Sequence, residues 1–98
     1  MKLVSLELSP VATRRVIGYA KEFNLIERIG YKLNGGRKRY FTIQEVKVLI
    51  KALLIKKNNQ KYQTICDIDS FLQNLKNIIE SPKDYLINIS KEDKVTKY

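Results

Sequence analysis

The sequence has no histidine and a single cysteine, Cys66. One cysteine can form neither an intramolecular disulfide nor a cysteine-based zinc site, and without histidine a zinc finger or a His-dependent catalytic triad is excluded. No glycine-rich phosphate loop is present, because Gly35-Gly36 is too short a run and is typical of a turn. Asp67 and Asp69 stand at an expected helix start, where capping and dipole compensation fit better than paired acid catalysis. We therefore expect no enzymatic activity, no cofactor and no metal.

Long apolar runs are also missing. The longest apolar-rich stretch, Val46 to Ile55, is interrupted by Lys47 and Lys51 and is too short to span a bilayer. The N-terminus lacks the apolar run of a signal peptide. The length of 98 residues suits one domain with a core of moderate size. We expect a cytoplasmic, nucleoid-associated protein with no membrane partner.

Acidic residues are few compared with basic ones. The chain has 19 Lys and Arg against 10 Asp and Glu, a net charge of +9. Residues 1–61 hold 14 basic and 4 acidic residues, whereas residues 62–98 hold 5 and 6. Such an imbalance favours a polyanion partner. We predict a DNA-binding domain over 1–61, a helical extension over 62–90 and a charged, frayed tail over 91–98.

The N-terminal third is expected to contain an amphipathic, cationic helix. Residues 3–8 alternate as a strand would, although a short helix is also possible and is the interpretation we favour. Ser9 as N-cap with Pro10 at the first helical position starts the next helix, unless Thr13 caps it after Pro10 ends the first. Either start gives a helix over about 14–23, ending at a left-handed Asn24. Its outward side carries Arg14, Arg15, Gly18 and Lys21.

Gly18 lies in the middle of this helix, where glycine costs about 1 kcal/mol relative to alanine. An outward glycine suggests close approach by a ligand, although packing against another segment would explain it equally well.

A β-hairpin with a cationic tip is predicted next. A strand over 28–33, a turn at Asn34-Gly35-Gly36 and a return strand over 37–41 follow from alternation and turn chemistry. Arg37 and Arg39 would share one face of the return strand, and Lys38 and Tyr40 the other. Tyr40 is expected to pack the hairpin against the core.

Two more helices complete the prediction. Thr42 and Glu45 form a capping box that opens a helix to about Lys57, ended by Asn58-Asn59-Gln60. Its predicted buried face is Val46, Leu49, Ile50, Leu53 and Leu54. A last helix runs from Asp67 or Asp69 to Glu80, with a wide apolar stripe. The stripe either closes the monomer's core or forms a homodimer interface, and the latter is the preferred interpretation.

Several of these segments resemble those of a known family of DNA-binding proteins. The segments Val16–Lys21, Asn24-Leu25, Gly35–Tyr40 and Glu45-Val46 are similar to the DNA-binding domain of MerR-type regulators, in the minimal form of BldC-like regulators and excisionases. Those domains have a helix aromatic, a wing with Gly-x-Arg-x-Tyr and an acidic, apolar start to the next helix. In this chain Gly18 replaces the usual Arg before the aromatic, and the long coiled coil and effector domain are missing.

Charge and resemblance together predict a mainly α fold with a small β-hairpin, a winged helix-turn-helix plus a C-terminal helix. The recognition helix (about 13–23) would enter the major groove of double-stranded DNA, and the basic wing (34–39) would lie on the adjoining backbone or minor groove. Arg14 and Arg15 would read base edges. The predicted DNA-binding residues are Arg14, Arg15, Gly18, Tyr19, Lys21, Lys32, Arg37, Lys38, Arg39 and Tyr40.

The function expected from this site is transcription regulation. The alternative is an excisionase or a plasmid or chromosome segregation adaptor that recruits a protein partner through residues 66–89. A binder of RNA or single strands is disfavoured because the six Tyr and three Phe are scattered and form no stacking platform.

Overall fold

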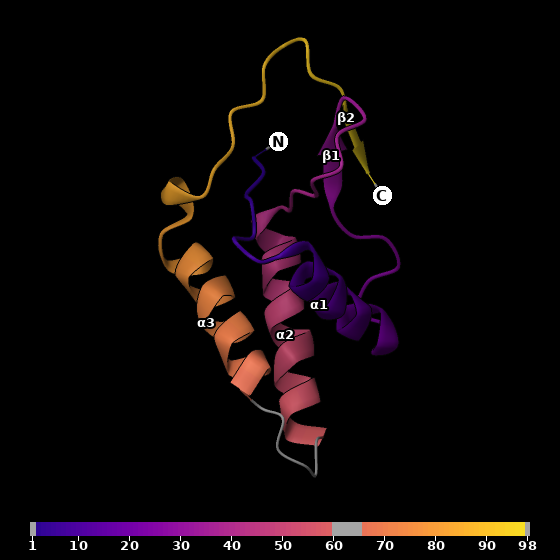
Figure 1. The fold of residues 1–98 in the computed structure, drawn as a ribbon, viewed down its shortest axis with the longest axis vertical. Helices are drawn as coiled ribbons and strands as arrows, with labels where there is room; N and C mark the ends of the chain where they lie inside the picture. Colours follow the sequence, from indigo (N-terminus) through magenta and orange to yellow (C-terminus); the bar gives the residue numbers. More distant parts are fainter. Residues whose placement is uncertain (1, 60–65, 98) are drawn as a thin grey trace.

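The computed structural model describes residues 2–59 and 66–97. Within them, the helical body consists of α1 (Pro10–Glu22), α2 (Ile43–Asn59) and α3 (Cys66–Glu80) (Figure 1). Helix α2 lies in the centre and packs against both α1 and α3. A one-turn 3-10 helix, η1 (Pro82–Asp84), follows α3, and strands β1 (Tyr31–Leu33) and β2 (Val95–Lys97) form a small antiparallel sheet. The mainly α prediction with a small antiparallel hairpin is confirmed, while the predicted boundary between residues 61 and 62 lies outside the described residues.

Helix α1 begins at the first of the two predicted starts. The Ser9 side-chain oxygen accepts a hydrogen bond from the Ala12 backbone N–H at 3.1 Å, and Pro10 is the first helical residue. The missing N–H of Pro10 costs nothing there, because first-turn donors have no partner within the helix. At the other end Asn24 has φ +56°, which confirms the predicted left-handed exit.

The short helix favoured over residues 3–8 is wrong. This segment is extended, and Val4 exchanges both backbone hydrogen bonds with Phe41, at 2.7 Å and 2.9 Å. On its other side the segment pairs with the chain after α3: Ser5 N–H donates to the Tyr85 carbonyl, and Ile87 N–H donates to the Leu3 carbonyl. A helix would satisfy its own backbone and leave those partners unpaired. No helix therefore precedes α1 in the described part of the chain, and the first helix of a helix-turn-helix pair is missing there.

The hairpin is shorter than predicted. The strand begins at Tyr31 and not at residue 28, because the buried Gly30 has φ +89° and turns the chain. In the returning segment, Tyr40 pairs with Tyr31 through two hydrogen bonds of 2.7 Å, and Phe41 pairs with Val4. The turn itself matches the prediction, with φ +47° at Asn34 and +74° at Gly35.

The tail predicted to fray is paired instead. Strand β2 lies antiparallel to β1, with Lys97 opposite Tyr31 and Val95 opposite Leu33. Asn34 secures the approach: its side-chain amide donates to the Asp93 carboxylate at 2.6 Å, and its side-chain carbonyl accepts from the Lys94 N–H at 2.7 Å. The charge of the tail did not reveal this pairing, because the partner strand's edge and the Asn34 turn are far away in sequence.

Glu45 joins the hairpin to α2. Thr42 and Glu45 form the predicted capping box: the Glu45 N–H donates to Thr42 Oγ1 at 3.2 Å, and the Thr42 N–H donates to Glu45 Oε1 at 2.9 Å. The other carboxylate oxygen, Oε2, accepts from the Gly30 N–H at 3.0 Å. The side chain is 6% exposed, so one buried carboxylate fixes both the start of α2 and the base of the hairpin.

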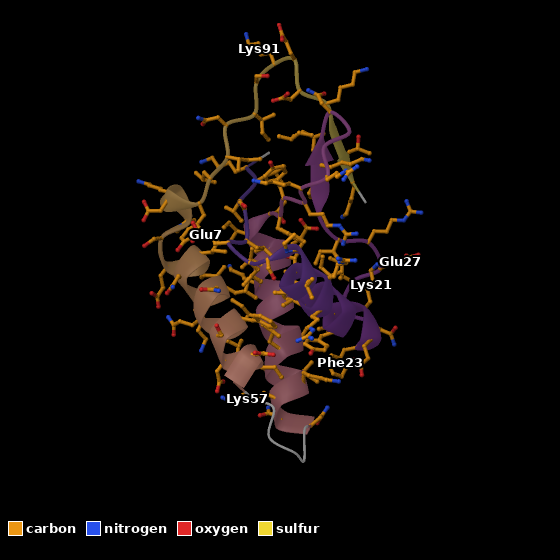
Figure 2. The ribbon with its side chains drawn as sticks, in the orientation of Figure 1. Glu7, Lys21, Phe23, Glu27, Lys57 and Lys91 are labelled. Atoms are coloured by element: carbon orange, nitrogen blue, oxygen red, sulfur yellow. The ribbon has the colours of Figure 1, made fainter. Side chains whose placement is uncertain are left out.

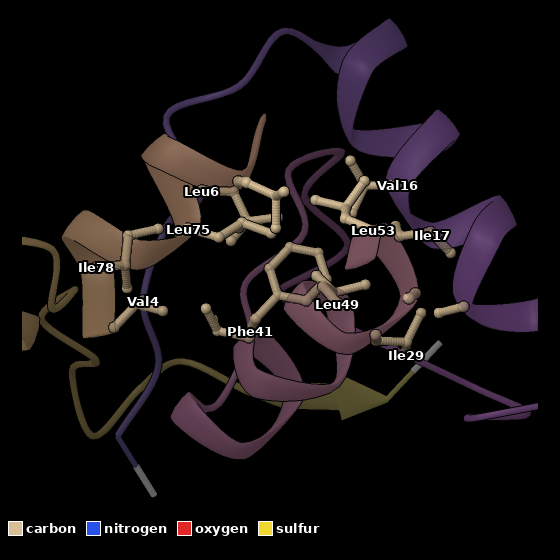
Figure 3. Close-up of a cluster of buried hydrophobic side chains, with 14 of the residues drawn as sticks. Val4, Leu6, Val16, Ile17, Ile29, Phe41, Leu49, Leu53, Leu75 and Ile78 are labelled. Carbon is tan, nitrogen blue, oxygen red and sulfur yellow. The ribbon is translucent and has the colours of Figure 1, made fainter. Parts of the chain in front are cut away.

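The core lies where the three helices meet the extended segments (Figure 3). The Phe41 ring is fully buried in the same cluster as Leu49, and Val4 also belongs to it. From α3, the side chains of Ile68, Leu72, Leu75 and Ile78 are at most 5% exposed in the single chain. The apolar stripe of α3 thus closes the monomer's core, and these four side chains are not available for the preferred dimer interface. Leu54, predicted as buried, is 42% exposed.

Glu45→Ala is expected to lower the free energy of unfolding by about 2–6 kcal/mol, because two backbone N–H groups lose their acceptor and each loss costs about 1–3 kcal/mol. Glu45→Gln, which keeps one acceptor oxygen, should lose less. Urea denaturation followed by circular dichroism measures both, with the exposed neighbour Gln44→Ala as control. Equal midpoints for Glu45→Ala and the control would contradict the role given to this carboxylate.

Asp93→Ala should loosen the tail from the hairpin while leaving the helical core folded. The substitution removes the acceptor of the Asn34 amide and of the Ser90 N–H. Amide hydrogen exchange at Asn34, whose N–H donates to the Lys94 carbonyl at 2.9 Å, should then speed up severalfold. Glu92→Ala, an exposed neighbour, should leave that exchange rate unchanged. Unaltered protection in Asp93→Ala would mean that strand pairing alone holds the tail.

Candidate nucleic-acid interface

A groove of about 740 Å³ lies between the N-terminal segment, the first turn and a half of α1 and the returning side of the hairpin. Four cations reach it from two distant parts of the sequence, namely Arg14 from α1 and Arg37, Lys38 and Arg39 from the hairpin. Its other lining residues are Ser5, Leu6, Glu7, Leu8, Pro10, Thr13 and Phe41. The groove is thus lined by apolar residues together with four cations and one acidic residue, Glu7.

The turn positions two of the hairpin cations, Arg37 and Lys38, whereas packing over Gly30 positions the third, Arg39. Arg37 and Lys38 are exposed just after the Asn34-Gly35 turn. Gly36 is needed there, since a Cβ on it would stand 2.9 Å from the Leu33 carbonyl oxygen. Arg39 is half-buried, and its side-chain carbon Cδ lies 3.4 Å from where a Cβ of Gly30 would be. The stem of Arg39 therefore lies over Gly30, whose amide is fixed by Glu45.

One side of α1 is open to solvent and cationic. Arg14, Gly18 and Lys21 follow one another at helical spacing, and all are exposed (Figure 2 labels Lys21). A Cβ added at Gly18 would meet no atom within 4 Å among the described residues. Of the two explanations for this glycine, packing against another described segment is therefore excluded. The helix backbone at Gly18 is open to solvent between Arg14 and Lys21.

The remaining predicted site residues lie away from the groove. Arg15 points toward α3, where its Nη1 is 3.3 Å from Asp67 Oδ2. The half-buried Tyr19 packs against the core, with Lys56 Nζ 5.1 Å from its ring centre. Lys21 borders a smaller pocket of about 350 Å³ beside Asn24, Ile26 and Glu27.

The two predicted site residues of the hairpin strands are also separate from the groove lining. Lys32 is half-buried in β1, opposite Thr96 of β2. Tyr40 is half-buried, and its backbone pairs with Tyr31. The structure thus gathers Arg14, Arg37, Lys38 and Arg39 around one groove and leaves the other predicted residues on neighbouring surfaces.

The N-terminal wall of the groove was not predicted from the sequence. Ser5, Leu6, Glu7 and Leu8 line it because the segment is extended and not helical. The signal was present in the alternation of Val4, Leu6 and Leu8, which suits a strand, but the family-like order of helices favoured the wrong interpretation.

Residues 2–59 and 66–97 contain neither a metal-binding cluster nor a membrane-spanning helix. No group of three or more His, Cys, Asp or Glu side chains there could hold a metal ion. No helix in these ranges is long and apolar enough to cross a membrane.

Gly18→Ala should raise the free energy of unfolding by about 0.5–1 kcal/mol. Alanine is the better helix former by that amount, and the added methyl group meets nothing within the described fold. Thermal or urea denaturation measures the gain. A loss of stability would show that a group at this position is hindered, contrary to the open surface found here.

Comparison of the chain with protein-family models, with curated proteins and with solved structures found no match in any of the three. The function has therefore to follow from the chain's own residues.

Proposed function

We propose that this chain binds double-stranded DNA with sequence preference and regulates transcription. Helix α1 would lie in the major groove, and the basic hairpin segment 34–39 would contact the adjoining backbone or minor groove. The domain would then act as a minimal relative of MerR-type DNA-binding domains, without the first helix of their helix-turn-helix pair. Its location would be the nucleoid.

The observation that carries this proposal is the convergence of cations on one groove. Arg14 and the run Arg37–Arg39 are more than twenty residues apart in sequence but line the same space. Four cations in one place repel one another, so a partner with regularly spaced negative charge would stabilise them. The phosphate backbone of DNA is such a partner.

The dimensions of α1 agree with this partner. A helix of 13 residues is about 20 Å long, and the major groove, about 12 Å wide, admits one helix. Arg14 lies near the N-terminal end of α1, the end from which recognition helices reach base edges. Bare backbone at Gly18 would let the helix come close to the DNA.

The ion pair of Arg15 does not stand against DNA contact. Its side chain is 57% exposed and that of Asp67 is 68% exposed, so water screens the pair. Exposed pairs contribute about 0–1 kcal/mol, which one phosphate or base contact can replace.

The protein-recruiting alternative has less support. A partner docking on the apolar face of α3 would need Ile68, Leu72, Leu75 and Ile78, which are buried within the chain. An excisionase or segregation adaptor would have to use what remains accessible in residues 66–89, such as the half-buried Phe71 and Ile79 and the exposed Leu86. A homodimer on two half-sites stays a prediction, and it could not use these four buried side chains.

Arg14→Ala and Lys38→Ala should weaken DNA binding in different ways. Loss of Arg14 should relax sequence preference, since a bidentate arginine contact to guanine discriminates by about 1–3 kcal/mol. Loss of Lys38 should weaken binding to all duplexes alike and reduce the salt slope by about one unit. Fluorescence anisotropy with selected and random duplexes at two salt concentrations measures both effects.

The control is Lys76→Ala, which removes the same charge from the exposed side of α3. Its effect on affinity should be small and equal for all duplexes. If the unaltered protein binds every duplex equally and loses all affinity in salt, sequence-specific binding is wrong. If the Arg14 and Lys38 variants behave alike, the division of roles between α1 and the hairpin is wrong.

A further inference from the structure

Glu7 is an acidic side chain inside the basic groove. It lines the same groove as Arg14 and Arg37–Arg39, and it is exposed. Figure 2 labels Glu7. No ion pair or hydrogen bond of its carboxylate occurs within residues 2–59 and 66–97. A negative charge at this place weakens the attraction of the groove for phosphate, so general affinity for DNA does not explain it.

Of the other three acidic residues in 1–61, two have structural roles, and the third, Glu27, is exposed beside the smaller pocket and does not line the groove. Glu22 lies 3.6 Å from Lys56 Nζ, and the buried Glu45 holds the hairpin base. Glu7 has no such partner among the described residues, although four cations line the same groove. Its carboxylate is therefore available to a bound molecule.

The position of Glu7 is fixed by its neighbours. Leu6 is buried and Leu8 is half-buried, so the alternation of the extended segment turns Glu7 toward solvent. The paired Val4 holds this segment from one end, and the Ser9 cap starts α1 at the other. Glu7 thus lies two residues before the cap, next to the end of α1 that would reach the bases.

A carboxylate only accepts hydrogen bonds, which restricts what it can contact on DNA. Phosphates, guanine O6 and N7 and thymine O4 are acceptors and would be repelled. The exocyclic amino groups, N4 of cytosine and N6 of adenine, are the donors that the major groove presents. A side chain that repels most of the duplex and accepts from one kind of group gives selectivity at the expense of affinity.

We infer that Glu7 is a specificity-determining residue that accepts a hydrogen bond from the exocyclic amino group of cytosine or adenine in the major groove. This inference rests on the proposed function, since it requires α1 to face the bases of a duplex.

The test uses a library of DNA duplexes with a randomised centre. The full-length protein and its Glu7→Ala variant, which lacks the acceptor oxygens, each select bound duplexes, and anisotropy then measures the affinity of both proteins for the selected and the random duplexes. The unaltered protein should select a site with cytosine or adenine at one position. Glu7→Ala should lose preference at that position by about fivefold or more, while its affinity for random duplexes rises. The base whose preference is lost tells cytosine from adenine.

Glu80→Ala is the matched control, because it removes the same charge from an exposed residue that does not line the groove. This variant should select the same site as the unaltered protein. If Glu7→Ala also selects that site and binds all duplexes more tightly by one common factor, Glu7 acts only through its charge and the inference is wrong, although DNA binding stands. If the unaltered protein selects no site, the proposed function fails and the inference fails with it.

Discussion

The buried carboxylate of Glu45 is the contact on which the arrangement of this protein depends. It accepts from the Thr42 N–H and the Gly30 N–H at the same time, while its own N–H is capped by Thr42 Oγ1. One side chain thus ties the first turn of the central helix to the base of the hairpin. A buried carboxylate is costly unless its oxygens are hydrogen-bonded, and here both are. Because Gly30 in turn supports the stem of Arg39, the same contact orients the cationic side of the hairpin.

The backbone pairing of five short segments gives the groove its shape. Leu86 pairs with Val4, Val4 with Phe41, the adjoining Tyr40 with Tyr31, and Tyr31 with Lys97. The N-terminal segment therefore lies inside this row and forms one wall of the groove, and the chain near its C-terminal end covers the free edge of β1. Single pairs of this kind are weak alone, but each one limits where the next segment can lie. Basic side chains repel one another, so this rigid frame is what keeps Arg14 and the hairpin cations close together.

Local chemistry made some elements predictable and left others open. Ser9, Thr42 and the Asn34-Gly35 turn each have a structure determined within three or four residues. The structure agrees with the prediction at Thr42 and at the turn, and at Ser9 it has one of the two predicted helix starts. The extended segment 3–8 and strand β2 depend on partners more than thirty residues away, and both were predicted wrongly. The four cations of the groove were predicted as DNA-binding residues, but the sequence did not predict that these four would line one groove. Glu7 was not predicted, because the segment that contains it was expected to be helical.

The sequence by itself determined α1, α2 and α3, the chain reversal and the excess of positive charge in residues 1–61, since capping, periodicity and charge are properties of nearby residues. Only the tertiary structure decided which surfaces remain open. In the sequence, the apolar stripe of α3 could have served either the core or a partner. Packing of α3 against α2 buries its residues Ile68, Leu72, Leu75 and Ile78 within the chain. Pairing of Val4 with Phe41 placed Glu7 among the cations. Both outcomes depend on contacts between distant segments, which local patterns cannot specify.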